Sequence, residues 1–220
     1  MLARRCLVAR QNQQDRNGGD SSSWDRATVY EEAQLGSGCE VYLSYRGQGL
    51  VHFYVSRADQ ASALARLMEE VAMRAQGGRL LPVSNPMSGA PCLARYSDGV
   101  WYRATVSHPA PKHGHIQIYF VDYGNSEIVP ASQVRATLPS LVTGLPAQAI
   151  PVRLSGCVGS IPEKVQEAFL AMVGEQRLRV VVEGVEGGLA VIQANTLPPG
   201  IRNINNELRS LIEGRYNFSA

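Results

Sequence analysis

What the sequence lacks narrows what the protein can be. No apolar run approaches the roughly 18 residues that a membrane-spanning helix requires. The four cysteines lie far apart, so there is no CxxC metal or redox pair, and they fit buried free thiols in a reducing compartment. A net charge of +2 provides no global basic field to attract nucleic acid. With 45% hydrophobic and 18% charged residues, the 220-residue chain has the composition of a soluble globular protein.

The sequence also lacks the signatures of catalysis. It contains no GxSxG, P-loop or HExxH motif and no GxGxxG following a strand. His108, His113 and His115 cluster in one loop, but no nearby cysteine or carboxylate completes a metal-ligand set, so a solvated loop is favoured. Because nothing pairs a nucleophile with a base, we predict that the protein is not an enzyme and binds no cofactor or metal.

Composition shifts divide the chain into four predicted segments. Residues 1–26 are polar and rich in arginine, serine and glycine; we predict a disordered tail of a longer protein and favour it over the alternative, a mitochondrial presequence. Residues 27–81 contain a predicted hairpin and a helix with an apolar stripe, N-capped by Asp59. Residues 82–140 are dense in short strands. Residues 141–215 combine strands with helices.

The strand-dense segment predicts a small barrel. Its strands CLARY, VWYRATVS, IQIYFVDY and SEIVP are separated by turns at Ser97-Asp98-Gly99 and Gly124-Asn125 and by a longer loop. Four or five short strands in about 50 residues cannot bury two faces as an open sheet, so we expect a strongly bent antiparallel barrel. With its flanking helices and strands, the chain is predicted to be an α+β protein.

Aromatic residues gather at the ends of these strands. Tyr96 and Tyr102 lie across the first turn from each other, while Phe120, Tyr123 and Asn125 surround the second. Two neighbouring turns at one end of a small barrel would bring four rings and one amide together. Ordinary core packing is the alternative, since Phe120 shares its strand parity with two isoleucines and should therefore point inward.

A ring cluster with one amide suits a soft, planar cation. Each aromatic face attracts a cation by about 0.5–2 kcal/mol, depending on desolvation. Methylated arginine keeps its charge, loses donors and gains apolar surface, so surrounding rings benefit from both burial and cation–π attraction. Asn125 could accept a remaining guanidinium N–H. The neighbouring Trp101 and Tyr119 are expected in the core or on its flank.

Three acidic residues flank the aromatic positions. A basic peptide should meet acidic groups, and Asp98, Asp122 and Glu127 are candidates for an acidic groove. Asp122 has a second possible role, because it lies between two of the aromatic positions and could brace the fold through Arg95 or Arg103. Surface ion pairs are common and weak, so the sequence leaves both roles open.

Two stretches carry a resemblance to a known family. The strings CLARYSDGVWYRATV and IQIYFVDYGNSEIVP closely resemble the Tudor domain family, the second through its F-x-D-Y-G-N signature. The flanks resemble the extended Tudor form, in which the Tudor barrel is inserted into a split staphylococcal-nuclease-like, OB-type module, with a long connecting helix. The resemblance covers about residues 27–215; it is strongest in the barrel and rests on element order in the flanks.

The resemblance implies a site, a ligand and a partner. Matched position by position, the family's methylarginine cage falls on Tyr96, Tyr102, Phe120, Tyr123 and Asn125. The implied function is that of a non-enzymatic adaptor for symmetrically dimethylated arginine in Arg-Gly or Arg-Ala motifs, with the peptide in the groove between barrel and nuclease-like module. The implied partner is the N-terminal tail of a PIWI-clade Argonaute of the piRNA pathway, and the implied location is cytoplasmic germ granules.

Two other functions stay open at this stage. OB-type modules bind single-stranded RNA through exposed aromatics in a basic groove, and the flanks offer Tyr42, Tyr45, Phe53 and Tyr54, but no basic stripe. The cage could instead take methyl-lysine, as many plain Tudor domains do, or unmethylated arginine. The extended flanks argue against methyl-lysine by analogy.

Overall fold

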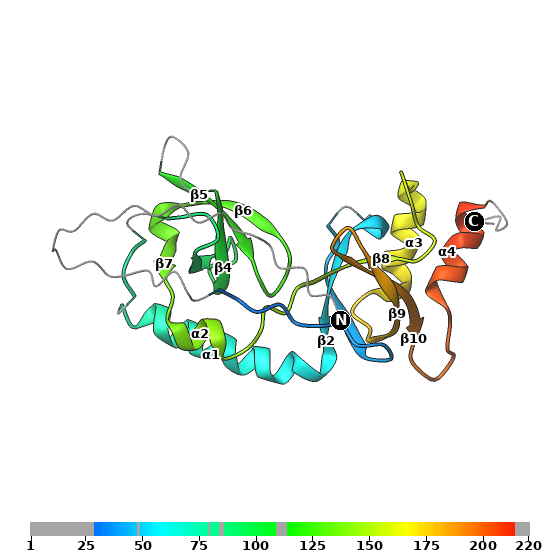
Figure 1. Cartoon of the computed structure of the whole chain (residues 1–220), viewed down its shortest axis with the longest axis horizontal. Helices are drawn as coiled ribbons and strands as arrows, with labels where there is room; N and C mark the ends of the chain where they lie inside the picture. The colour runs from blue at the N-terminus through cyan, green and yellow to red at the C-terminus, as the bar shows by residue number, and fades with distance from the viewer. Residues whose placement is uncertain (1–28, 48, 79, 84–85, 109–113, 214–220) are drawn as a thin grey trace.

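The computed structural model describes residues 29–47, 49–78, 80–83, 86–108 and 114–213. These residues form two β units that lie side by side along the long axis of the molecule, with helix α1 (Ala61–Gln76) running along one side (Figure 1). No helix within these residues is long and apolar enough to cross a membrane. The predicted tail, residues 1–26, and His113 of the histidine cluster lie outside the described ranges.

The first unit is a closed five-stranded barrel built from two distant parts of the chain. Around the barrel, the strands are β1 (Glu40–Tyr45), β2 (Phe53–Arg57), β8 (Ile150–Leu154), β10 (Leu189–Thr196) and β9 (Leu178–Glu186). Neighbouring strands are antiparallel except for β10 and β8, which are parallel. The hairpin β1–β2 therefore pairs with strands that follow the inserted second unit, as the element order predicted.

Two helices cover this barrel and complete its core. Helix α3 (Glu163–Val173) places Phe169 against Phe53, with ring centroids 5.4 Å apart, and helix α4 (Ile204–Ile212) contributes the buried Leu208. The remaining core residues are mainly valine, leucine and isoleucine from the barrel strands. The barrel thus encloses a tightly packed, mainly aliphatic core, which makes it a rigid support for the second unit.

The second unit is a five-stranded antiparallel sheet. In order, its strands are β6 (Ser126–Pro130), β5 (His115–Phe120), β4 (Trp101–His108), β3 (Pro91–Arg95) and β7 (Val134–Ala136). All five strands contribute to one core, so the sheet is strongly bent around it. Within the described residues the edge strands β6 and β7 are not paired with each other, so hydrogen bonds do not close this unit into a full barrel.

Local structure departs from the sequence-based expectations at three points. Strand β5 ends at Phe120 and not at Tyr123, because the next three residues form a turn. The short strand β7 and helix α2 (Pro139–Thr143) were not predicted. Asp59 does not cap α1; it lies in a 3-10 turn and pairs with Arg57 instead. The 3-10 turns are η1 (Gly49–Val51), η2 (Ala58–Gln60) and η3 (Ala131–Gln133).

Helix α1 packs on the outer face of the bent sheet. Its buried stripe contains Leu67 and Val71, as the apolar spacing predicted, and these residues pack with Leu93 of β3 and Leu141 of α2. The helix therefore has sheet on one side and solvent on the other. It connects the barrel hairpin to the sheet and holds the two units in a defined relation.

Candidate functional site

A cavity of about 230 Å³ opens where the bent sheet meets the barrel. The structure brings all five predicted cage residues to its wall, together with one of the predicted acidic residues. Two further residues come from strand β1 of the barrel, and no feature of the sequence assigned them to this site. The lining residues are Ser44, Tyr45, Tyr96, Asp98, Tyr102, Phe120, Tyr123 and Asn125.

The four predicted cage rings meet at near right angles. The centroids of Tyr96, Tyr102 and Phe120 are 5.5, 5.7 and 6.3 Å apart in their three pairs, with interplanar angles of 78–87°. Tyr123 stands at 86° to Tyr102, with centroids 5.1 Å apart. Edge-to-face contacts of this kind are favourable in themselves, because the positive edge of one ring meets the negative face of the next. They also give the cavity several aromatic walls of different orientation.

Phe120 forms the floor of the cavity. It is only 1% exposed, whereas the three tyrosines are half-buried. Strand pairing sets Phe120 opposite Ala104 and Tyr102 opposite Ala94, and both alanines are fully buried. Because these cross-strand partners are small, the rings have room on the concave face of the sheet. The inward direction that strand parity predicted for Phe120 is therefore compatible with its place at the cavity.

The turn after β5 sets Tyr123 and Asn125 relative to this floor. The Phe120 carbonyl accepts hydrogen bonds from the backbone N–H groups of Tyr123 (3.2 Å) and Gly124 (2.9 Å), and the Phe120 N–H donates to the Asn125 carbonyl (2.9 Å). Gly124 has a φ of +97°, and a Cβ there would lie 2.3 Å from Cγ of Tyr54 in β2. Glycine is thus required both for the backbone conformation and for docking the turn against the barrel.

A buried ion pair anchors the same turn. Arg103 is 0% and Asp122 1% exposed, and Nε and Nη2 of the arginine donate to the two carboxylate oxygens at 2.9 and 2.6 Å. The other hydrogen bonds of the guanidinium go to backbone carbonyls, that of Leu141 in helix α2 and those of Leu145 and Pro146 just after it. The carboxylate also accepts a hydrogen bond of 3.1 Å from the backbone N–H of Gln148. Burial of a charged pair is tolerated when its hydrogen bonds are satisfied in this way.

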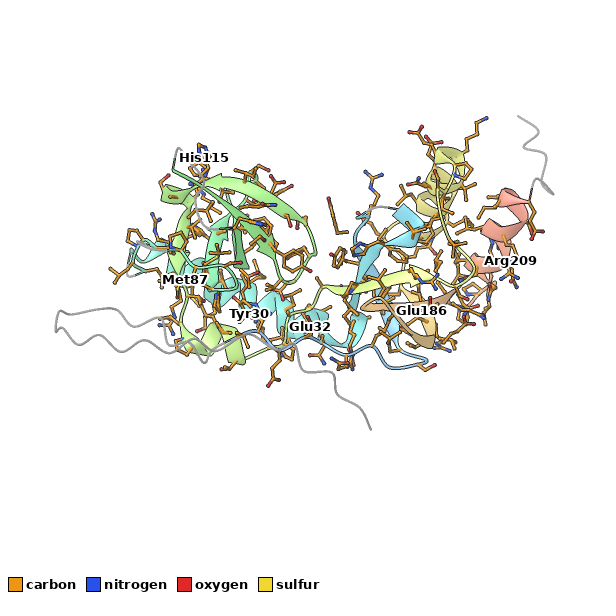
Figure 2. All side chains as sticks on the ribbon, turned by 45° about the horizontal axis from the view of Figure 1, so that its top comes forward. Tyr30, Glu32, Met87, His115, Glu186 and Arg209 are labelled. Carbon is orange, nitrogen blue, oxygen red and sulfur yellow. The ribbon has the colours of Figure 1, made fainter. Side chains whose placement is uncertain are left out.

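The segment before β1 completes this anchor. The Tyr30 ring lies 5.0 Å from the guanidinium carbon of Arg103, a distance at which a cation–π contact is favourable. Ala147 N–H donates to Glu31 O at 2.7 Å, and Ala33 N–H donates to Ala147 O at 2.9 Å. Figure 2 shows Tyr30 below the sheet unit and Glu32 further toward the barrel. The anchor therefore joins three distant parts of the chain.

These contacts decide which predicted acidic residues reach the cavity. Asp122 braces the fold through Arg103, so its proposed place in an acidic groove is wrong: a buried, paired carboxylate cannot meet a peptide. Arg95 is not its partner and donates to the carbonyl of Gly99 at 2.8 Å. Glu127 lies on the edge strand β6 and does not line the cavity. Of the three candidates, only Asp98 does.

Asp98 and the cage tyrosines form a small polar rim. The Tyr102 hydroxyl donates to Asp98 Oδ2 at 2.7 Å, and the Val100 N–H donates to Oδ1 at 2.8 Å. Burial, and then the Asp98 carboxylate, raise the pKa of Tyr102 above its ordinary value. Burial, Asp122 and Asp98 likewise raise the pKa of Tyr123. Both rings therefore stay neutral at physiological pH and keep the electron-rich faces that a cation needs.

The barrel's contribution to the cavity was missed by the sequence analysis. Tyr45 is 42% exposed, and its ring centroid is 6.2 Å from that of Tyr54. The Ser44 hydroxyl oxygen is buried and has no hydrogen-bond partner within the described residues. Both belong to a strand that precedes the cage motifs by a long stretch of chain, so no local spacing could have placed them here. The sequence had suggested Tyr45 only as one of several ring residues of an RNA-binding face.

Two of the three clustered histidines, His108 and His115, do not line the cavity. His115 is at the end of the sheet unit away from the barrel (Figure 2), and His108 ends strand β4. Within the described part of the chain, no group of three histidine, cysteine or acidic side chains is arranged to hold a metal ion. The thiols of Cys39, Cys92 and Cys157 are free.

Comparison with known proteins finds the same motif and fold elsewhere. A model of the Tudor domain family matches residues 33–156. Human Tudor domain-containing protein 6 is 30% identical over 154 residues, which cover 69% of this chain and 7% of that protein. The chain therefore corresponds to a small part of that relative's length.

Solved structures share the fold over most of the chain. The extended Tudor domain TD3 of mouse TDRD1, in complex with a MILI peptide containing dimethylarginine, has a TM-score of 0.75 at 24% identity, covering 83% of this chain and 96% of that one. The extended Tudor domain of human TDRD1, in complex with a symmetrically dimethylated peptide, has a TM-score of 0.75 at 22% identity, covering 84% and 93%. These likenesses confirm the predicted fold, a Tudor unit embedded in a split nuclease-like module.

Proposed function

The chain belongs to the Tudor domain family, and on that basis we propose that it is a non-enzymatic reader of methylated arginine. Its ligand is symmetrically dimethylated arginine in an Arg-Gly or Arg-Ala motif. The observation that carries the proposal is the cavity of about 230 Å³ on which four rings converge at near right angles. Two extended Tudor domains of the same fold were solved with dimethylated peptides, which supports the same ligand class here.

The chemistry of the cavity suits a methylated guanidinium. The faces of neutral tyrosines attract the cation, and the buried Phe120 offers apolar surface to the methyl groups. Asp98 adds a carboxylate at the rim, which complements the positive charge. The Asn125 side chain, on the same wall, is assigned the remaining guanidinium N–H.

The alternatives fit this cavity less well. An unmethylated guanidinium keeps more of its hydration, so its transfer between rings is less favourable. A trimethylated lysine has the charge and the methyl groups but no N–H for Asn125. An RNA phosphate would be repelled by the Asp98 carboxylate. The lining residues include no lysine or arginine to bind it.

The partner assigned to this site is the arginine-rich N-terminal tail of a PIWI-clade Argonaute of the piRNA pathway. The peptide would lie along the groove between the sheet unit and the barrel, because the cavity is lined from both. The adaptor would then act in cytoplasmic germ granules, where such partners are expected from the family. The open question of RNA binding is settled by whether the chain binds RNA at low salt.

Calorimetric titration with one Arg-Gly-repeat peptide tests the proposal. The peptide is used unmethylated, symmetrically dimethylated and, in a lysine version, trimethylated. We expect the symmetrically dimethylated form to bind most tightly. Tyr123→Ala should weaken its binding roughly tenfold or more, since it removes both a cation–π contact and apolar cover, and Asn125→Ala should act in the same direction.

Ile128→Ala is the matched control. Ile128 is 66% exposed on β6, close to the site in sequence, and does not line the cavity, so its variant should bind like the unaltered protein. Circular dichroism checks that Tyr123→Ala remains folded. Equal affinity for methylated and unmethylated peptides, or full affinity in Tyr123→Ala, would contradict a methylarginine reader.

A further inference from the structure

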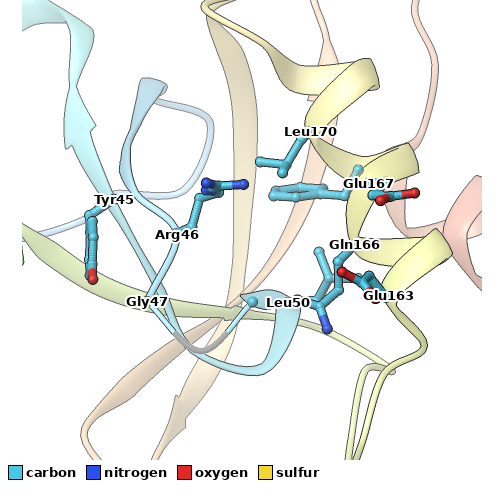
Figure 3. Close-up of a pocket in the computed structure, with 10 residues that line it drawn as sticks. Tyr45, Arg46, Gly47, Leu50, Glu163, Gln166, Glu167 and Leu170 are labelled. Carbon is cyan, nitrogen blue, oxygen red and sulfur yellow. The ribbon is translucent and has the colours of Figure 1, made fainter.

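A second cavity, of about 400 Å³, adjoins the cage on the barrel side. Tyr45 lines both cavities, so the two meet at this ring. One wall of the second cavity is the loop between β1 and β2, and the other is helix α3, as Figure 3 shows. Its lining includes Arg46, Leu50, Glu163, Gln166, Glu167 and Leu170.

This cavity is built into the fold. Gly49 has a φ of +77°, and a Cβ at that position would lie 2.4 Å from Oε1 of Gln166, so the loop backbone lies directly against this side chain of the helix. Gln166 is held in turn by a hydrogen bond of 3.0 Å from its Nε2 to the carbonyl of Ile161. Leu50 and Phe169, both buried, give the cavity an apolar base.

The helix side of the cavity carries two carboxylates. Glu163 and Glu167 lie one turn apart on α3 and are exposed, and both line the cavity. Within the described residues neither takes part in an ion pair. Like charges at this spacing repel each other, so a cation placed between them is stabilised by both. Arg46 enters from the loop side and opposes such a cation (Figure 3).

We propose that this cavity is a second subsite for the same peptide, which takes an unmethylated arginine or lysine side chain flanking the methylarginine. The inference rests on the proposed function, because the cage fixes the peptide beside Tyr45. Tyr45, 42% exposed, is the shared wall over which the peptide backbone passes from one cavity to the other. Here the cation is held by carboxylates over an apolar base, so a side chain that keeps all its N–H donors binds best.

The test compares a short and a long peptide on the whole chain. The short peptide carries one symmetrically dimethylated arginine between glycines, and the long peptides add a second, unmethylated arginine that is moved stepwise along the sequence. Unaltered protein should bind the long peptide with the best spacing more tightly than the short one. In Glu163→Gln/Glu167→Gln, affinity for that long peptide should fall roughly three- to tenfold, while affinity for the short peptide is unchanged.

Two further variants make the result specific. Glu69→Gln/Glu175→Gln removes the same charge from two exposed positions that line neither cavity, and should bind both peptides normally. Arg46→Gln removes the opposing charge and should raise the affinity for the long peptide about two- to threefold. A change in the opposite direction for Arg46→Gln would overturn the subsite.

The remaining outcomes separate this inference from the proposed function. Equal losses for long and short peptides, or equal losses in the control pair, would overturn the subsite and indicate a general electrostatic effect. No loss at all in Glu163→Gln/Glu167→Gln, with the short peptide still bound, would overturn the subsite and leave the cage standing. No binding of either methylated peptide by the unaltered protein would overturn the proposed function and the subsite with it.

Discussion

Aromatic rings lie on both faces of strand β5. One group borders a cavity, and the other packs where the sheet unit meets the barrel. Phe120 and its three tyrosine neighbours surround a cavity. Tyr119, the preceding residue, points to the other face and packs toward Tyr54 of the barrel, with centroids 6.2 Å apart. Tyr54 in turn packs on Gly124 and contacts Tyr45.

The comparison shows that aromatic density alone does not identify a binding site. The cage contains three tyrosines and one phenylalanine, with centroids 5.1–6.3 Å apart, and the second group contains Tyr119, Tyr54 and Tyr45, with centroids 6.2 Å apart. Tyr54 and Tyr119 pack against each other across the junction, and Tyr54 lies against Gly124 of the turn. The cage rings also pack against the core of the sheet unit, but on one side they border a cavity. The contacts across the junction therefore decide which rings are packed there and which border a cavity.

The largest expected effect on stability comes from the buried ion pair of Arg103 and Asp122. Asp122→Asn should lower the free energy of unfolding by roughly 3–5 kcal/mol, because it leaves Arg103 charged, buried and uncompensated. Asp98→Asn, the matched change at the exposed acidic residue, should cost only about 1 kcal/mol. Urea denaturation followed by circular dichroism measures both. Similar small losses in the two variants would show that the brace does not hold the turn.

The docking of the turn on Tyr54 should be the next most sensitive feature. Gly124→Ala should destabilise the protein by roughly 2–4 kcal/mol, since its Cβ overlaps the Tyr54 ring and its backbone is left-handed. Adding Tyr54→Ala removes the overlap but not the backbone cost, so the double variant should lose less than the sum of the two single variants. A double-mutant cycle in urea measures the coupling. Additive losses would contradict the close packing.

Alkaline pH should destabilise the protein through both ring groups, and by a smaller amount. Burial raises the pKa of Tyr102 in the cage and of Tyr119 at the junction. The folded pKa lies above the unfolded value of about 10, so this contribution to stability is complete below pH 10 and is lost as pH rises toward the folded pKa. The free energy of unfolding should therefore fall above about pH 10.

A cationic ligand should act on one group only. A bound methylguanidinium favours the ionised form of a nearby tyrosine, so it should lower the pKa of the cage tyrosines and leave that of Tyr119 in place. Ultraviolet titration of tyrosinate with and without the peptide measures the shift. The shift should persist in Tyr119→Phe and shrink in Tyr102→Phe; the reverse pattern would place the ligand at the junction.

The sequence by itself determined the features that depend on residues close together in the chain. Strand alternation and turn residues predicted most of the sheet unit, because hairpins are set by local spacing. The five cage positions could be named for the same reason: they lie on two adjacent turns within one short stretch. The structure brings these five to one cavity, where their binding role remains a prediction.

Only the tertiary structure decided the features that join distant residues. Asp122 could have met a peptide or a buried arginine, and the choice of Arg103 depends on backbone carbonyls in and just after α2 that complete its hydrogen bonds. Tyr45 and Gly124 gained their roles only when the barrel docked against the sheet. Local periodicity does not encode how two units dock; that is set by which surfaces are complementary once both have folded.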